Sequence, residues 1–269
     1  KVGNEYELIV SRDFRLNVEK NHTATHLLNE ALRHEVGSHI KQAGSLVTDE
    51  KLRFDITHFA PLTKEEIEKV EQEVNKQIWN ALEIKTEEMP IAEARKLGAQ
   101  ALFGEKYGDI VRVVSIGDYS IELCGGTHNS NSSEVGIFKV ISETGVAAGV
   151  RRIEALTGRA AYEYLRQQEE TLRTVEKLTK ANASNVVEKV TNLQTEIKKL
   201  SKEKESLQQK IANAELNNLV NNIKEVNGIN VLTSLVESEN MNHLKQLVDN
   251  AKSKLENYII AFASINDDK

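Results

Sequence analysis

The chain has 269 residues, a formal net charge of −6 at pH 7 and 28% charged residues. Its length predicts two or three modest domains, and its acidic balance argues against a protein that coats nucleic acid through bulk electrostatics. It contains neither an apolar run of roughly eighteen residues nor a leader-like segment, so we expect a cytoplasmic protein and exclude a membrane protein.

Residues 1–160 mix helical and β-rich stretches and contain both prolines of the chain. Apolar residues at helical spacing predict a helix over residues 25–34. A second helix is predicted over 62–79, where Thr63 and Glu66 have the spacing of a capping box. We therefore expect residues 1–160 to form a globular domain.

A β-hairpin is predicted farther along the same domain. Residues 111–116 and 119–124 are β-rich runs, and Gly117 and Asp118 between them fit a tight turn. Cys124 comes where the second run ends. Helices together with an antiparallel sheet place the domain in the α+β class.

A helical arm is predicted over residues 161–224, which contain no proline and are rich in Lys, Glu, Gln and Asn. From residue 186 on, apolar residues alternate steps of four and three, the repeat of a coiled-coil seam, broken only at Lys204. The seam residues are Val186, Val190, Leu193, Ile197, Leu200, Leu207, Ile211 and Ala214.

An earlier helix of the arm carries its own apolar residues, namely Leu165, Leu172, Val175 and Leu178. Residues 182–185 interrupt the pattern, and Asn185 and Glu188 are placed to cap the next helix. We predict a long helical coiled-coil hairpin of two antiparallel helices. Such a hairpin leaves part of its seam uncovered, so we also expect a homodimer through the arm.

Residues 225–269 predict a strand, a helix and a strand in that order. Gly228 precedes the apolar run 229–236, a helical stretch follows over about 239–256, and 258–265 is apolar again. This βαβ order predicts two parallel strands in a partial α/β domain that is too small for a complete core. Since the chain also begins without methionine, we expect a fragment of a longer protein.

The sharpest chemical pattern joins His22 and His26 with Cys124 and His128, two pairs that share one spacing. Helical positions four apart lie on one face, so the two helical imidazoles can face one ion. Cysteine thiolate and histidine nitrogen are ligands that zinc prefers, and Cys124 is the one cysteine of the chain. The two glycines after Cys124 would permit a tight turn toward His128. The pattern predicts a zinc site.

Other residues have competing interpretations. Thr23 stands where an HExxH helix would carry its glutamate, which disfavours a metalloprotease.

Gln42 lies in a run of small polar residues and is either an ordinary loop residue or part of a binding site. Arg151 and Arg152 either clamp a phosphate or carboxylate or form a plain surface pair. Surface or satisfied core positions are expected for His34, His39, His58 and His243.

Six sequence blocks resemble the editing region of the alanyl-tRNA synthetase family and follow the order of that family. They are HTATHLL at 22–28, QAGSLV at 42–47, LRFD at 52–55, ALFGEKYGD at 101–109, ELCGGTH at 122–128 and GVRRIEALTG at 149–158. Their residues are closer to those of this family than to those of threonyl-tRNA synthetase editing domains. The resemblance implies an editing domain over 1–160, a helical arm over 161–224 and the start of a C-terminal domain over 225–269.

The resemblance also implies an aminoacyl-tRNA deacylase that hydrolyses tRNA(Ala) mischarged with serine or glycine. An alanine pocket rejects these amino acids too weakly, so a second site must remove the errors. The implied residues are the zinc ligands His22, His26, Cys124 and His128, Thr25 for the serine hydroxyl, Gln42 in the pocket, and Arg151 and Arg152 as candidates for tRNA contact. A full-length relative would also attach alanine to tRNA(Ala) with ATP, but no motif for that step is visible here.

Two alternatives stay open. Four protein ligands would close a tetrahedral zinc and make it structural, whereas hydrolysis by metal-activated water needs an open position and one loose ligand. The chain could then be a non-catalytic tRNA-binding or dimerisation module with a structural zinc. A freestanding alanyl-tRNA editing protein would carry the same sequence blocks.

Overall fold

The computed structural model describes residues 3, 5–101, 107–221, 223–236 and 241–264. The chain forms two compact units, Lys1–Thr171 and Leu172–Lys269. The boundary between them falls inside helix α4 (Gly158–Thr179). Within the described ranges, no helix combines the length and the apolar character that crossing a membrane requires.

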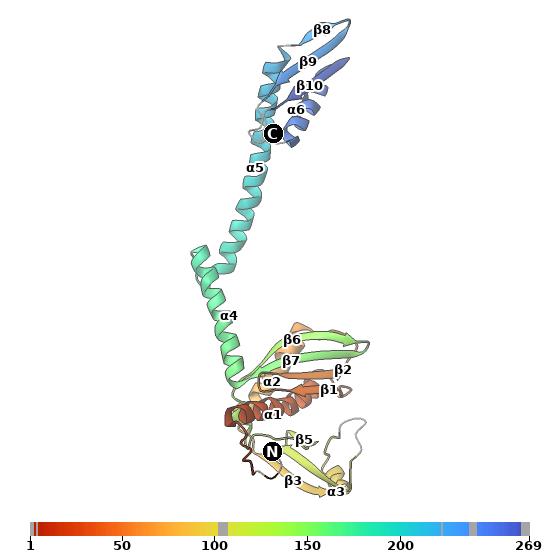
Figure 1. The fold of residues 1–269 in the computed structure, drawn as a ribbon, viewed down its shortest axis with the longest axis vertical. Coiled ribbons are helices and arrows are strands. Elements are labelled where there is room, and N and C mark those ends of the chain that lie inside the picture. The colour runs from red at the N-terminus through yellow and green to blue at the C-terminus, as the bar shows by residue number, and fades with distance from the viewer. Residues whose placement is uncertain (1–2, 4, 102–106, 222, 237–240, 265–269) are drawn as a thin grey trace. The chain divides into compact units, whose positions relative to one another are not determined.

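Helix α1 (Arg12–Glu35) is the central element of the first unit and contacts strands of both of its sheets (Figure 1). The sequence predicted only its second half, because the apolar residues of the first turns, Phe14, Leu16 and Val18, are spaced two apart and form no helical stripe. Residues 23–29 are all buried, so the helix has no solvent-facing side there. Its polar side chains in this stretch must therefore find partners inside the protein.

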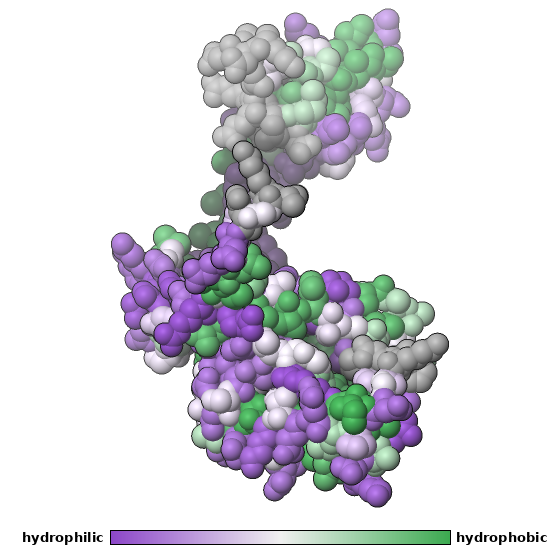
Figure 2. Space-filling model, turned by 60° about the horizontal axis from the view of Figure 1, so that its bottom comes forward, coloured by the Kyte–Doolittle hydropathy of each residue, from purple (hydrophilic) through white to green (hydrophobic). Residues whose placement is uncertain are grey.

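The larger sheet has the order β1-β2-β7-β6, and every neighbouring pair is antiparallel. Its strands are β1 (Gln42–Val47), β2 (Leu52–Thr57), β6 (Phe138–Ala147) and β7 (Val150–Thr157). Helix α2 (Lys64–Trp79) and α1 share one buried hydrophobic cluster with this sheet. Figure 2 shows mostly hydrophilic side chains on the visible face of this unit, with apolar side chains in small patches.

The smaller sheet, in the order β3-β4-β5, is also antiparallel. It consists of β3 (Ile84–Pro90), β4 (Ile110–Ile116) and β5 (Ser120–Leu123). The short helices α3 (Ile91–Lys96) and η1 (Ser132–Val135) lie outside the sheets. The α+β class predicted for this part of the chain is confirmed.

Two local predictions in the first unit are also confirmed. The Thr63 hydroxyl accepts a hydrogen bond from the Glu66 backbone N–H, and the Glu66 carboxylate accepts one from the Thr63 backbone N–H, which completes the capping box. The β4–β5 hairpin turns at Gly117, whose φ of 51° lies in the left-handed region.

The second unit contains α5 (Val186–Val220), β8 (Lys224–Val226), β9 (Ile229–Leu235), α6 (Met241–Lys252) and β10 (Tyr258–Ala263). Strands β9 and β10 are parallel, which confirms the βαβ prediction. The predicted positions 239–240 and 265 lie outside the described residues.

Strand β8 was not predicted. It pairs antiparallel with β9 across Asn227 and Gly228, which both have positive φ. An Asn-Gly pair is a strong hairpin signal, but the flanking apolar run on the β8 side is too short to stand out. The three-stranded sheet therefore has the order β10-β9-β8.

The core of the second unit includes the end of the long helix. Ala212 of α5 is fully buried in a cluster with Val236 and Leu247. The βαβ unit was expected to be too small for a core of its own. Helix α5 packs against it and supplies part of that core.

Two expectations for the arm concern the packing of its apolar seam and the capping of its second helix by Asn185. Helices α4 and α5 occupy the predicted segments, but the seam side chains of Leu193, Ile197 and Leu200 are 39%, 63% and 55% exposed in the single chain. Their packing against an antiparallel partner helix is therefore not confirmed. Asn185 is the N-cap residue of α5, yet its side chain caps nothing and instead accepts a hydrogen bond from Asn182 N at 2.8 Å.

Candidate metal centre

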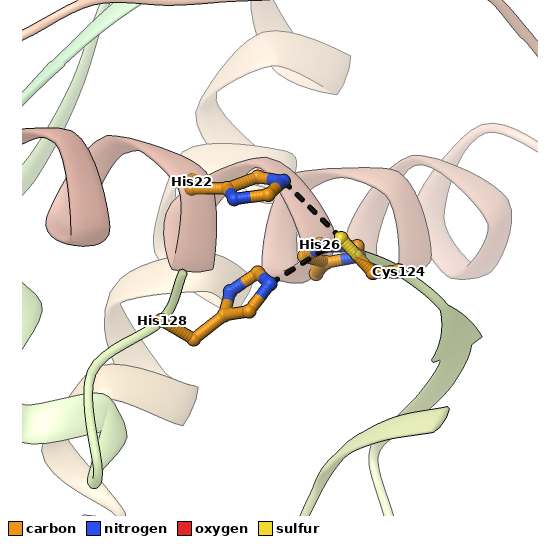
Figure 3. A group of neighbouring side chains, drawn as sticks. All are labelled: His22, His26, Cys124 and His128. Atoms are coloured by element: carbon orange, nitrogen blue, oxygen red, sulfur yellow. Dashed lines mark hydrogen bonds between the residues drawn. The ribbon is translucent and has the colours of Figure 1, made fainter. Parts of the chain in front are cut away.

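The four predicted ligands meet at one point. His22 and His26 project from α1, and Cys124 and His128 come from the loop after β5 (Figure 3). Their ligand atoms all lie within 4.8 Å of one another. The Cys124 sulfur is 3.4 Å from His22 Nε2 and 3.3 Å from His128 Nε2. Tetrahedral zinc, with bonds of about 2.0–2.3 Å, sets its ligand atoms about 3.3–3.7 Å apart, so these separations fit.

Each imidazole uses its Nδ1 for a neighbour outside the centre. His22 Nδ1 lies 3.2 Å from the Thr127 carbonyl oxygen, and His128 Nδ1 lies 3.5 Å from the Thr23 hydroxyl. His26 Nδ1 lies 2.8 Å from the Glu122 carboxylate. A proton on Nδ1 leaves the lone pair of Nε2 for a metal.

The clearest sign that the group suits a cation is an unsatisfied atom. His26 Nε2 is buried and has no hydrogen-bond partner among the described residues. A buried polar atom without a partner costs free energy, and a metal ion at the common point would satisfy it. The residues therefore fit zinc in donor chemistry, spacing and tautomer.

The charges around the group fit a bound cation. Burial would raise the pKa of Cys124, but hydrogen bonds from His128 and His22 lower it to about 3, which favours the thiolate that metals bind. Burial lowers the pKa of His128 to about 4. Burial acts in the same direction on His26, but the negative charges of Glu122 and Cys124 raise its pKa to about 10. A bound metal would replace the proton that these charges attract.

Gly126 lets the loop approach the helix. A Cβ at this position would overlap the His22 imidazole ring, whereas a Cβ on Gly125 would meet nothing within 4 Å. Neither glycine has a positive φ. Glycine is therefore not required at either position by a left-handed backbone, and the reason at Gly126 is close approach to an imidazole.

Arg112 holds the same loop from β4. One of its terminal nitrogens donates to the carbonyl oxygens of Cys124, at 2.7 Å, and Gly126, at 2.6 Å. The Cys124 backbone N–H donates to the Arg112 carbonyl oxygen at 3.1 Å. Sequence reasoning missed Arg112, because its position beside the loop follows from strand pairing and from no local spacing.

A cavity of about 340 Å³ opens beside the ligand group. Besides His22, His26 and Cys124, its polar lining includes Thr25, Gln42, Ser45, Arg112 and Glu122. Thr25 donates its hydroxyl proton to the Asn21 carbonyl oxygen at 2.8 Å. Gln42 donates from its side-chain amide to the Ser45 hydroxyl at 3.4 Å. Both candidate pocket residues thus line the cavity that borders the metal ligands.

The two candidate tRNA-contact arginines lie elsewhere. Arg151 and Arg152 are on β7, close to its start at Val150. Arg151 pairs with the Glu143 carboxylate and Arg152 with Asp55, each through two hydrogen bonds. Neither lines the cavity. These two carboxylates occupy much of the donor capacity of the arginines.

His34, His39 and His58 fit their expected ordinary roles. His34 pairs with Glu30 at 3.1 Å, and His39 and His58 contact each other at 3.0 Å. The contact between His39 and His58 was not predicted. The side chain of His243 lies outside the described part of the chain.

Known proteins are similar in sequence to part of this site and to nearly the whole chain. Residues 111–154, which include Cys124 and His128, match a family described as the threonyl and alanyl tRNA synthetase second additional domain. The chain is 48% identical over 261 residues to proteins named alanine–tRNA ligase in Bacillus anthracis and Bacillus mycoides, which covers 97% of the chain and 30% of each relative. A Bacillus subtilis protein of the same name is 48% identical over 260 residues. The chain thus spans less than a third of the length of these curated relatives.

Proposed function

Because the chain is homologous to alanine–tRNA ligases over nearly its whole length, we propose that it is the editing module of such an enzyme. Its substrate would be tRNA(Ala) that carries serine or glycine in error. The observation that carries the proposal is the convergence of Cys124 with three imidazole Nε2 atoms beside a cavity. Water would add to the ester carbonyl carbon, and the terminal ribose oxygen would leave with a proton.

In this proposal the metal is zinc, and its ligands are His22, His26, Cys124 and His128. Bound zinc would supply Lewis acidity at the ester or lower the pKa of a water molecule. Either role needs one loose ligand. The longest of the three contacts that orient the imidazoles is the 3.5 Å contact between His128 and Thr23, so His128 is the ligand we expect to yield.

Thr25 would recognise the serine side chain. Because its hydroxyl proton goes to the Asn21 carbonyl oxygen, the Thr25 oxygen presents lone pairs and can accept a hydrogen bond from a substrate hydroxyl. Serine offers that hydroxyl, whereas alanine and glycine do not. Gln42 would contact the substrate in the same pocket, which Ser45 also lines.

The rest of the chain would serve tRNA and assembly. We assign residues 1–160 to editing, 161–224 to the arm and 225–269 to a C-terminal domain, with ATP-dependent attachment of alanine left to other parts of a longer parent. Arg151 and Arg152 would reach tRNA with the N–H groups that their ion pairs leave over. The exposed seam of α5 would be covered by a second copy of the chain, which makes a homodimer.

A second candidate function rests on the same four ligands. A closed set of four protein ligands is also typical of structural zinc, in which case the chain would bind tRNA without hydrolysis. Incubation of the zinc-loaded chain with Ser-tRNA(Ala) separates the two. Release of serine supports the deacylase, and an intact ester with bound tRNA supports the binding module.

A further inference from the structure

Glu122 is a buried carboxylate next to the ligand group, and the set of four ligands does not include it. Its side chain projects from β5 and is 4% exposed. One carboxylate oxygen accepts from His26 Nδ1 at 2.8 Å. The other accepts from the Asn29 side-chain amide at 3.1 Å and from the Ser120 hydroxyl at 3.2 Å. All three donors are buried.

A buried carboxylate at position 122 calls for a physical explanation. Burial of a carboxylate is costly unless it is paired, and a glutamine would fill the same space without that cost. Among the described residues, no lysine or arginine hydrogen-bonds to Glu122. His26 is therefore its one hydrogen-bond partner that can share positive charge.

His26 is held differently from the other two imidazoles. The Nδ1 atoms of His22 and His128 contact neutral oxygens at 3.2 and 3.5 Å, whereas His26 Nδ1 contacts a carboxylate at 2.8 Å. Hydrogen bonds with an ionised partner are about twice as strong as neutral ones. His26 is also the imidazole whose buried Nε2 has no other partner in the described chain.

We propose that Glu122 is a positioning residue that keeps the proton of His26 on Nδ1 and directs Nε2 toward the metal. The inference rests on the proposed zinc site but not on hydrolysis. Through the same contact the carboxylate increases the donor strength of His26 and balances positive charge at the centre. Asn29 and Ser120 hold the carboxylate in place for this role.

The variant Glu122→Gln keeps the volume and disturbs this arrangement in either orientation of the amide. With its oxygen toward Asn29 and Ser120, its NH₂ group faces His26 Nδ1, which must then accept. The imidazole proton moves to Nε2 and blocks the metal. With the amide reversed, the tautomer survives, but Asn29 must flip and the charge is gone.

The test is zinc affinity of the whole chain, measured by competition with a chelator. We expect about 10- to 100-fold weaker binding for Glu122→Gln, the usual effect of removing a residue that orients a metal ligand. Glu87→Gln is the matched control, because Glu87 is an exposed glutamate on β3 of the same sheet. It should bind zinc like the unmodified chain.

Thermal unfolding with and without zinc separates positioning from a purely structural role. A positioning role predicts that Glu122→Gln reduces the rise in stability that zinc confers. Unchanged zinc affinity, or an unchanged zinc-induced rise beside a less stable metal-free chain, would overturn the inference. If the unmodified chain itself fails to bind zinc, the proposed metal centre is wrong. If the chain binds zinc as expected but does not hydrolyse the ester, the proposed function is wrong and the role of Glu122 is unaffected.

Discussion

The Asp55 carboxylate accepts two hydrogen bonds from the Arg152 guanidinium, both at 2.8 Å. The two residues are direct partners across the β2–β7 pair. The hydrogen bonds from Arg152 hold the pKa of Asp55 below its usual value, against the opposite effect of burial. The ion pair thus links two central strands of the sheet that packs on α1.

Asp55→Asn should destabilise the fold in a pH-dependent way. A carboxyl with a lowered folded pKa contributes stability above its unfolded value, near 3.8, and loses it as the pH falls through the folded value. We expect a clear loss in the free energy of unfolding at pH 7 and a smaller loss well below pH 3.8. Urea denaturation at both pH values measures this, with Glu87→Gln as control. Equal losses at both would contradict it.

Gly126→Ala should damage the metal centre, whereas Gly125→Ala should not. The new Cβ at 126 would overlap the His22 ring, while the space at 125 is open. We expect zinc affinity to fall about tenfold or more for Gly126→Ala. Bound zinc is measured by elemental analysis after dialysis against chelator. Equal losses in both variants would mean that backbone freedom of the loop, and not its approach to His22, is what matters.

Thr25→Val should change the choice of substrate. Valine keeps the shape but removes the oxygen that we assign to the serine hydroxyl. Hydrolysis of Ser-tRNA(Ala) should fall about two- to tenfold, the value of one hydrogen bond, while hydrolysis of Gly-tRNA(Ala) stays constant. The glycyl ester is the internal control. A parallel loss on both esters would remove the proposed role of Thr25.

The exposed seam of α5 should mediate self-association. Leu200→Glu should weaken it, because a charge in an apolar interface is costly. Val187→Glu is the control, since Val187 is 77% exposed but lies off the seam. Light scattering across a concentration series gives the mass. A monomeric mass at every concentration for the unmodified chain would show that the arm does not dimerise.

The sequence predicted the cluster of His22, His26, Cys124 and His128 because each pair has a local spacing. Four residues make one helical turn for His22 and His26, and the same interval joins Cys124 to His128 within one loop. Both spacings can be recognised in the sequence without knowledge of the fold. The capping box at Thr63 was predictable for the same reason.

The residues that organise the site were missed because their roles depend on contacts between distant segments. Glu122 reaches His26, 96 positions away, and Arg112 reaches the Cys124 loop from a neighbouring strand. No spacing in the sequence marks either contact. For α5 the sequence predicted the apolar repeat but not its packing partner. A repeat of apolar residues does not indicate which surface covers them.

The most direct test of the proposed editing site is hydrolysis of Ser-tRNA(Ala) by the purified, zinc-loaded chain, compared with correctly charged Ala-tRNA(Ala). Cys124→Ala, which removes the one thiolate ligand, serves as the inactive reference. We predict rapid release of serine, slow release of alanine, and loss of the serine reaction in the variant. If the zinc-loaded, folded chain leaves Ser-tRNA(Ala) intact, or if Cys124→Ala hydrolyses it equally well, the proposed editing site is wrong.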